Sequence, residues 1–129
     1  MLVTPYYAAV FGLLFVALSY RIITLRRKYQ VSIGDDNHKE LIRAIRVHGN
    51  FSEYVPFALL LIYFIEVTTD NVLFVHVSCL IFLFARILHA YGVSQVNENI
   101  RWRFYGILTT GGVISLSALY ILIHGLFGA

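Results

Sequence analysis

Apolar residues fall into four long runs along the 129-residue chain, with short polar connections between them. The runs over residues 2–25 and 72–88 each hold a single Arg, and the run over residues 104–127 holds no Asp, Glu, Lys or Arg. The remaining run, residues 55–65, reaches spanning length only together with the more polar residues before it. Because a transmembrane helix needs about 20 mainly apolar residues, the pattern predicts helices over residues 2–27, 38–67, 72–92 and 101–127.

Four crossings would use most of the chain, so we predict one domain over residues 1–129. Its expected fold is an all-α integral membrane protein, a four-transmembrane-helix bundle. Arg26, Arg27 and Lys28 follow the first apolar run, whereas a signal peptide carries its basic residues before that run and ends in a small-residue cleavage site. We therefore expect the first helix to be retained.

Composition agrees with a membrane protein. Hydrophobic residues make up 59% of the chain and charged residues 13%, whereas soluble domains carry about 25% charged residues. The single Cys excludes an intramolecular disulfide and a multi-cysteine metal site, and we expect no bound metal. No phosphate-binding loop, catalytic triad or nucleic-acid-binding pattern is visible, so we expect no nucleic-acid partner.

Basic residues gather on one side of the predicted membrane. The positive-inside rule places Lys and Arg in cytoplasmic loops. With both termini on the non-cytoplasmic side, all ten Lys and Arg lie in or beside the first and third connections, and the second connection carries Glu66, Asp70 and no basic residue. We therefore predict a multi-pass protein, of the cell inner membrane if bacterial, whose basic end lies in the cytoplasm.

Two local patterns predict how helices start and pack. Residues 34–37 predict a turn, and Asn37 followed three residues later by Glu40 resembles a capping box, which would start the second helix near His38. The fourth helix contains small residues, among them Gly106 and Gly112, which let helices approach closely in lipid.

A stripe of polar residues follows the predicted second helix. Its members are Arg43, Arg46, Asn50 and Glu53, at i, i+3, i+7 and i+10, which lie within an arc of about 80° on an α-helix. Ionisable residues inside a membrane turn toward the bundle interior or a wet cavity and are candidates for function. We expect this stripe to face inward. One interpretation is a structural network in which Glu53 neutralises an Arg; the other, which we favour, is a site for a ligand with carboxylates.

Two further helices bring polar residues to the same membrane end. Arg86 and His89 lie three residues apart on the third helix, and the fourth helix begins with Arg101, Trp102 and Arg103, with Tyr105 four residues after Arg101. Taken singly, an Arg at a helix end is usually an anchor at the membrane interface. Taken together, these residues and the stripe predict an anion-binding cavity.

The other His residues and the Cys carry less functional weight. His48 points about 160° away from Arg46 around a regular helix, so it faces another subunit or lipid headgroups in our interpretation. His76 and His124 lie toward the opposite end of the protein, without metal-ligand partners at usable spacing. We interpret both, and Cys79, as structural.

The segment over residues 40–56, with Arg-x-x-Arg-x-x-x-Asn-x-x-Glu, together with Ala-Arg-Ile-Leu-His at residues 85–89 and Arg-Trp-Arg at residues 101–103, resembles the signature of the membrane-associated proteins in eicosanoid and glutathione metabolism (MAPEG). The resemblance covers nearly the whole chain and is nearest to the small bacterial branch, which shares a Tyr-x-Val-x-x-Gly-Asp loop, here residues 29–35.

The resemblance implies a homotrimer that binds glutathione as co-substrate between neighbouring subunits toward the cytoplasmic side. It also implies a transferase or peroxidase acting on lipophilic electrophiles that arrive from the membrane lipids. By position, Arg46, Asn50 and Glu53 would hold the peptide, helped by Arg86 and His89. Arg43 and Tyr105, which belong to the same group of polar residues, complete our set of candidate glutathione-binding residues.

In the catalytic members that the chain resembles, an Arg at the start of the fourth helix stabilises the glutathione thiolate. Arg101 matches by its spacing to Tyr105 and is our first choice, and Arg103 matches by its spacing to Gly106 and is the alternative. The chain departs from the eicosanoid enzymes of the family at Gly49, where they have Arg, and at Val93, where they have Tyr.

Two other function classes remain open. A non-catalytic lipid-binding or scaffolding protein of the same fold is the alternative to an enzyme, and assays of glutathione binding and turnover distinguish the two. A small multidrug transporter is also built from four helices, but such proteins rely on a carboxylate in the first helix, where this chain has none.

Overall fold

The computed structural model describes residues 1–128 and consists of four α-helices. In chain order they are α1 (Thr4–Tyr29), α2 (Lys39–Thr68), α3 (Val72–Ser94) and α4 (Ile100–Phe127). All four are long and apolar enough to cross a membrane. Four apolar helices were predicted from the sequence, and their ends differ from the predicted ones by at most two residues.

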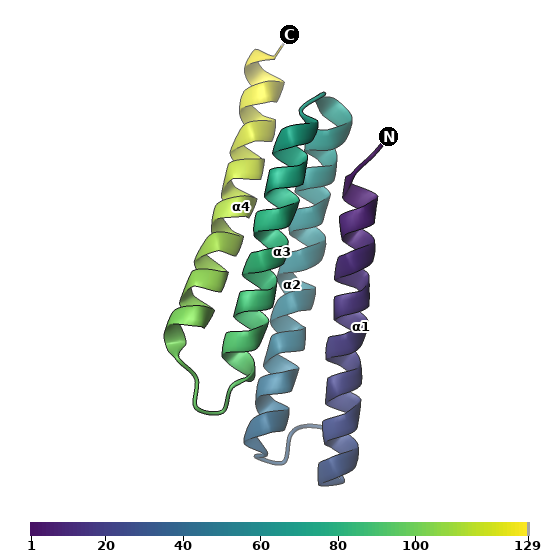
Figure 1. Ribbon diagram of the computed structural model, residues 1–129, viewed down its shortest axis with the longest axis vertical. Coiled ribbons are helices and arrows are strands. Elements are labelled where there is room, and N and C mark those ends of the chain that lie inside the picture. The colour runs from purple at the N-terminus through teal and green to yellow at the C-terminus, as the bar shows by residue number, and fades with distance from the viewer. Residues whose placement is uncertain (129) are drawn as a thin grey trace.

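The helices run roughly alongside one another, with both termini at one end (Figure 1). The α1–α2 and α3–α4 connections lie at the opposite end, and the α2–α3 connection lies at the end of the termini. Helix α1 packs on α2 and, less extensively, on α3, whereas α4 packs on α3 and α2. Within residues 1–128, α1 and α4 make no helix–helix contact.

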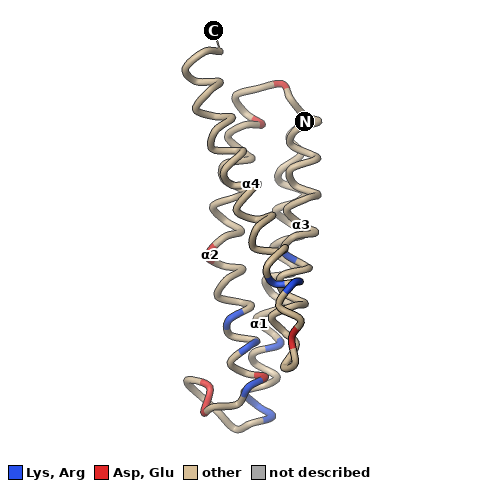
Figure 2. The backbone as a smooth tube through the Cα atoms, turned by 90° about the vertical axis from the view of Figure 1, so that its left-hand side faces the viewer, with Lys and Arg blue, Asp and Glu red and all other residues tan. Residues whose placement is uncertain are grey.

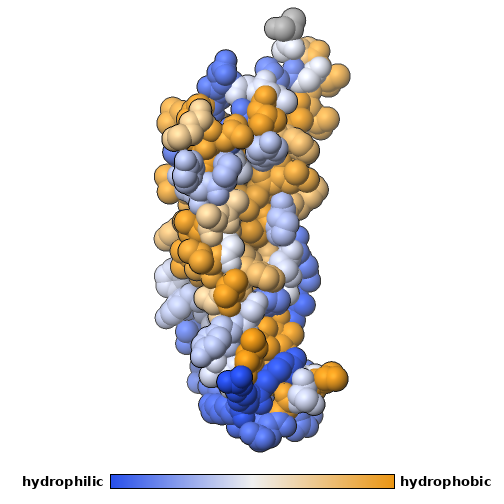
Figure 3. Space-filling model, turned by 90° about the vertical axis from the view of Figure 1, so that its right-hand side faces the viewer, coloured by the Kyte–Doolittle hydropathy of each residue, from blue (hydrophilic) through white to orange (hydrophobic). Residues whose placement is uncertain are grey.

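An apolar core fills the space between the helices. The ring of Phe11 on α1 lies 5.1 Å from that of Phe82 on α3 and 6.1 Å from that of Phe51 on α2, and all three side chains are buried. Large apolar side chains nevertheless cover the outside, as the orange surface over the middle and upper parts of Figure 3 shows. An exterior this apolar is expected where lipid, and not water, is the solvent.

Basic residues are distributed unevenly along the long axis of the molecule. Figure 2 shows Lys and Arg confined to the half that holds the α1–α2 and α3–α4 connections. The opposite end carries Glu66 and Asp70 near the α2–α3 connection. The structure therefore has the one-sided charge that the sequence predicted for a membrane protein.

The predicted capping box at the start of α2 is wrong. His38 is the N-cap residue and no side chain caps the helix. Glu40 instead accepts hydrogen bonds from Tyr29 Oη at 2.6 Å and Lys28 Nζ at 3.1 Å, both at the end of α1. The carboxylate of Glu40 therefore accepts hydrogen bonds from two side chains of the neighbouring helix and does not cap its own. These contacts hold the end of α1 to the start of α2.

Helix α1 is held to the bundle by polar contacts near both ends. At its N-terminus, the carboxylate of Glu66 on α2 accepts the backbone N–H of Val3 and, at 2.9 Å, that of Thr4. At the other end, Arg21 donates to Ser94 of α3 at 2.5 Å. Few residues of α1 are buried, so these contacts position a helix whose apolar packing is sparse.

We expect Glu66→Gln to loosen the first turn of α1. A carboxylate at a helix N-terminus satisfies free N–H groups and interacts with the helix dipole, which contributes about 1 kcal/mol. Hydrogen exchange in detergent should show faster exchange of the amides of residues 3–8 in this variant. Asp70→Asn, in the exposed connection nearby, is the matched control and should leave those amides unchanged; equal effects of both variants would refute the role of Glu66.

Helices α3 and α4 approach each other closely at two glycines, Gly92 and Gly106. A Cβ added to Gly92 would lie 2.8 Å from the backbone N of Arg103, and one added to Gly106 would lie 2.7 Å from Cβ of His89 and 2.8 Å from its backbone N. Around Gly111 and Gly112, by contrast, there is open space. The small residues of α4 therefore serve close packing on one face only, the face that meets α3.

Candidate functional site

A buried arginine organises the polar residues inside the basic half. Arg86 of α3 is 0% exposed. Its Nη2 donates to Asn50 Oδ1 of α2 at 2.6 Å and lies 3.3 Å from His89 Nδ1, and its Nη1 donates to Thr110 Oγ1 of α4 at 3.4 Å. One guanidinium thus connects three helices.

The partners of Arg86 are all neutral. Among residues 1–128 it forms no ion pair, and its Nε has no hydrogen-bond partner. The guanidinium also lies 6.0 Å from the ring centre of Phe51 and 5.9 Å from that of Tyr54, within cation–π range. Because Arg86 has no exposed surface, we interpret it as a residue that positions Asn50 and His89.

A basic cavity lies next to this network, where α2, α3 and α4 meet the α3–α4 connection. It encloses about 410 Å³. Four of its lining residues are cationic and one is anionic; the full lining is Lys39, Ile42, Arg43, Arg46, Val93, Val96, Glu98 and Arg103. The cavity is therefore suited to an anionic ligand.

Glu98 is the anion of this cavity and was not singled out from the sequence. Its Oε1 lies 3.2 Å from Arg43 Nη1 and 3.7 Å from Arg103 Nη1, so it pairs with α2 and α4 together. Arg43 Nη1 also donates to the carbonyl of Val93 at 3.1 Å. A signal was present in the sequence, since Glu98 is the only acidic residue after Asp70 and comes shortly before Arg101 and Arg103.

The prediction that the stripe on α2 faces inward is wrong for two of its four members. Arg46 and Glu53 are exposed, whereas Arg43 and Asn50 are partly buried. Within the described chain Glu53 forms no ion pair, so it does not neutralise an Arg of its own subunit. The reason is that an apolar line with helical spacing, including Val47, occupies the inward face of α2 and leaves the stripe along its side.

Gly49 lies between the two exposed stripe residues. A Cβ at this position would be 3.8 Å from Arg46 Nη1 and 4.0 Å from Glu53 Oε1. These are ordinary van der Waals distances, so the position accepts a side chain. Arg46 and Glu53 therefore flank a small open space on the surface of the subunit.

Arg101 and Tyr105 lie outside the basic cavity. Both are exposed, and Tyr105 packs edge-on against Phe104 with ring centres 5.6 Å apart. The backbone N–H of Arg101 donates to the side chain of Asn99, which caps α4. Of the two Arg residues considered for the thiolate, Arg103 lines the cavity and Arg101 does not.

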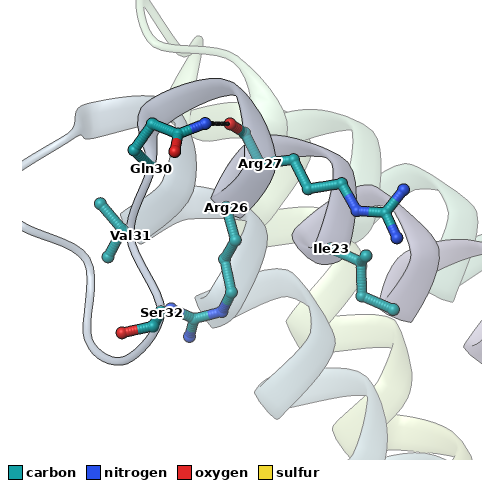
Figure 4. A pocket seen from close by; sticks show the side chains of 6 residues that line it. All are labelled: Ile23, Arg26, Arg27, Gln30, Val31 and Ser32. Carbon is teal, nitrogen blue, oxygen red and sulfur yellow. Dashed lines mark hydrogen bonds between the residues drawn. The ribbon is translucent and has the colours of Figure 1, made fainter.

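A second basic pocket lies at the end of α1 (Figure 4). It is a shallow surface depression with a volume of about 420 Å³, lined by Ile23, Arg26, Arg27, Gln30, Val31 and Ser32. Arg26 bends toward the α1–α2 connection and donates to the carbonyl of Gly34 at 2.6 Å, whereas Arg27 extends away from it (Figure 4). This pocket lies on one helix end and is separate from the cavity around Glu98.

An apolar groove runs between α1 and α2. One part encloses about 350 Å³ and includes Phe11, Phe51 and Leu59 in its lining, and an adjoining part of about 320 Å³ shares Ala8, Pro56 and Leu59 with it. The groove has almost no polar lining and is large enough for part of an acyl chain or an aromatic molecule.

His48 and His76 both have partners within the bundle. His48 Nε2 lies 2.9 Å from Ser19 Oγ, and its ring centre is 4.7 Å from that of Phe15. The prediction that His48 faces another subunit or the headgroups is therefore wrong: it faces α1 of its own chain. His76 Nδ1 lies 3.1 Å from Tyr7 Oη, in line with a structural role.

Comparison with known proteins gave two consistent findings. The model of the MAPEG family matches residues 4–123. The chain is also 35% identical over 118 residues to inner membrane protein YecN of Escherichia coli strain K12, an alignment that covers 92% of this chain and 88% of YecN, and the same values hold for YecN of E. coli O6:H1.

Proposed function

Since the chain belongs to the MAPEG family and is a multi-pass membrane protein with four apolar helices, we propose that it is a membrane-bound, glutathione-dependent transferase or peroxidase acting on lipophilic electrophiles. The observation that carries the proposal is the basic cavity of residues 39, 42, 43, 46, 93, 96, 98 and 103. Glutathione has two carboxylates, and guanidinium groups bind carboxylates in a charge-assisted, often bidentate geometry.

The peptide-binding residues of this proposal come from three helices. Arg43 and Arg46 would bind carboxylates, and Asn50, held by Arg86, would orient the peptide backbone. Arg86 and His89 act through that network, because both are buried. Glu53 and Tyr105 are exposed in a single subunit, so they would reach the ligand only at an interface.

We infer a homotrimer with glutathione between neighbouring subunits. Exposure of Arg46 and Glu53 on the surface of one subunit supports a site completed by another, because charged residues on a lipid-facing surface are costly. The sparse burial of α1 also supports contacts beyond its own bundle. A measured mass of three subunits in detergent is expected, and a monomer would contradict the inference.

The chemistry proposed for the protein is stabilisation of a thiolate. Glutathione supplies the sulfur nucleophile, and a guanidinium beside that sulfur lowers the pKa of the thiol, as cations do for protein cysteines. Arg103 is the better placed residue because it lines the cavity, and Arg101 remains the alternative for a site shared between subunits. The chain's own residues would supply charge and orientation, and no protein nucleophile is required.

The proposed orientation places the basic half in the cytoplasm and both termini on the other side. The asymmetry of Lys and Arg supports it, and the similarity to YecN, named an inner membrane protein, supports location in the bacterial inner membrane. Glutathione would then enter from the cytoplasm, and the electrophile would enter from the lipid.

Two measurements on the purified protein test the function. Conjugation of a chlorinated nitrobenzene should depend on glutathione, and calorimetry should detect glutathione binding to the detergent-solubilised protein. Arg43→Ala should weaken that binding by roughly tenfold, because it removes a charge-assisted contact. Absence of both binding and turnover would refute the enzyme proposal.

The apolar groove between α1 and α2 favours a second candidate, a non-catalytic lipid-binding or scaffolding protein of the same fold. Such a protein would bind lipophilic ligands with no glutathione-dependent rate. Leu59→Trp, which fills the shared part of the groove, should reduce binding of a fluorescent fatty acid in this case while the glutathione assays stay silent.

A further inference from the structure

Glu98 occupies the place in the basic cavity where a ligand carboxylate would bind. It lies in the α3–α4 connection, residues 95–99, between the end of α3 and the start of α4. Its Oε1 lies within 4 Å of a guanidinium nitrogen of both Arg43 and Arg103. The two cations best placed to hold an anion are therefore already bound to one supplied by the protein.

The contact made by Glu98 is incomplete. The side chain is 16% exposed, and its second oxygen, Oε2, is buried without a hydrogen-bond partner among the described residues. A carboxylate oxygen removed from water without a partner is unfavourable, so the paired state of Glu98 is less stable than its two ion pairs alone suggest. Rotation of the side chain into water would restore the hydration of both oxygens.

The surroundings of Glu98 permit this rotation. Its neighbours Asn97 and Asn99 are exposed, so solvent lies beside the connection. Arg43 would retain its hydrogen bond to the carbonyl of Val93 after Glu98 leaves, and half of the Arg103 side chain is already exposed. The two guanidinium groups can therefore stay in place while their anionic partner is exchanged.

We propose that Glu98 is an internal carboxylate that occupies the anion site of the empty protein and is displaced when a carboxylate of the ligand binds Arg43, which leaves Arg103 free to face the thiol. The inference rests on the proposed glutathione function and adds regulation to the same cavity. Glu98 neutralises one of the four cations in the unliganded state. Because the ligand must compete with it, Glu98 raises the glutathione concentration that is needed for binding. A ligand without a free carboxylate would not displace it.

Glu98→Gln tests the inference, because glutamine keeps the shape of the side chain and removes its charge. We expect glutathione to bind this variant roughly three- to tenfold more tightly than the wild type, the range expected when a competing ion pair is removed. The unfolding temperature of this variant should be lower than that of the wild type, because the α3–α4 connection loses its ion pairs with Arg43 of α2 and Arg103 of α4. Asn97→Ala in the same connection is the control and should change neither quantity.

The identity of the competing group is tested with modified ligands. Glutathione and its two monoethyl esters, each lacking one carboxylate charge, are titrated into both proteins by calorimetry. The gain caused by Glu98→Gln should disappear for one ester, the one whose blocked carboxylate is the competitor, and persist for the other.

Three results would overturn the inference. Weaker binding together with a lower unfolding temperature in Glu98→Gln would make Glu98 a structural tie only. An equal gain for all three ligands would mean that it acts through net charge. Unchanged glutathione binding in this variant would exclude displacement while leaving the proposed function intact, whereas no glutathione binding by either protein would refute both.

Discussion

Arg103→Ala is expected to slow glutathione conjugation by about 10²- to 10³-fold, the range found when one stabilising donor is removed from a developing anion. Arg103 lines the basic cavity and lies near Glu98, so its guanidinium is the cation of α4 that would face the peptide in the proposed site. Without it, the pKa of the bound thiol should rise toward about 8.5, the value of a free thiol. The ultraviolet absorbance of the thiolate, followed against pH, measures that change directly.

Two variants make the Arg103 experiment decisive. Arg101→Ala removes an equal charge two residues away, where the side chain is exposed and outside the cavity, and should leave the thiol pKa unchanged. Arg103→Lys keeps the charge and should recover part of the rate. If Arg101→Ala shifts the thiol pKa and Arg103→Ala does not, the first choice made from the sequence is correct, and the site is shared between subunits.

The helices were predictable from sequence because their signal is local. Runs of apolar residues set the four spans, and the small differences at their ends have local causes. Helix α1 begins at Thr4, with Pro5 in its first turn, and continues to Tyr29, beyond which Gln30 adopts a left-handed conformation with φ of 57°. Such end effects depend on backbone geometry, which hydrophobic periodicity does not record.

The site was only partly predictable, because its contacts join distant residues. The grouping of Asn50, Arg86 and His89 agrees with the common membrane depth read from the sequence. The ion pairs of Glu98 could not be predicted from the sequence, because they depend on how the α3–α4 connection folds back toward α2. The prediction of which side of α2 faces inward was wrong for Arg46 and Glu53. The spacing of polar residues does not determine which of two adjacent helix faces packs its apolar residues against the bundle.

Gly106→Ala is expected to destabilise the protein by about 1–3 kcal/mol, the range for an extra carbon in a close-packed contact. The added Cβ would lie 2.7 to 2.9 Å from Cβ, N and Cα of His89. These are atoms on or next to the α3 backbone that cannot turn aside, so α3 and α4 must separate. Thr110 lies one turn after Gly106 on the same face and donates to its carbonyl at 2.8 Å, so the movement would also disturb the contact of Thr110 with Arg86.

Gly112→Ala is the matched control for the Gly106 variant, and the expected effect has the opposite sign. There is open space around Gly112, and alanine favours a helix over glycine by about 1 kcal/mol, so this variant should unfold at the same or a higher temperature in detergent.

Because Gly106 sets the distance between α4 and His89, its replacement should also weaken glutathione binding, since Arg103 and Arg43 would no longer face one cavity. A Gly106→Ala protein with wild-type stability and wild-type binding would show that α3 and α4 can separate at this point without affecting the site.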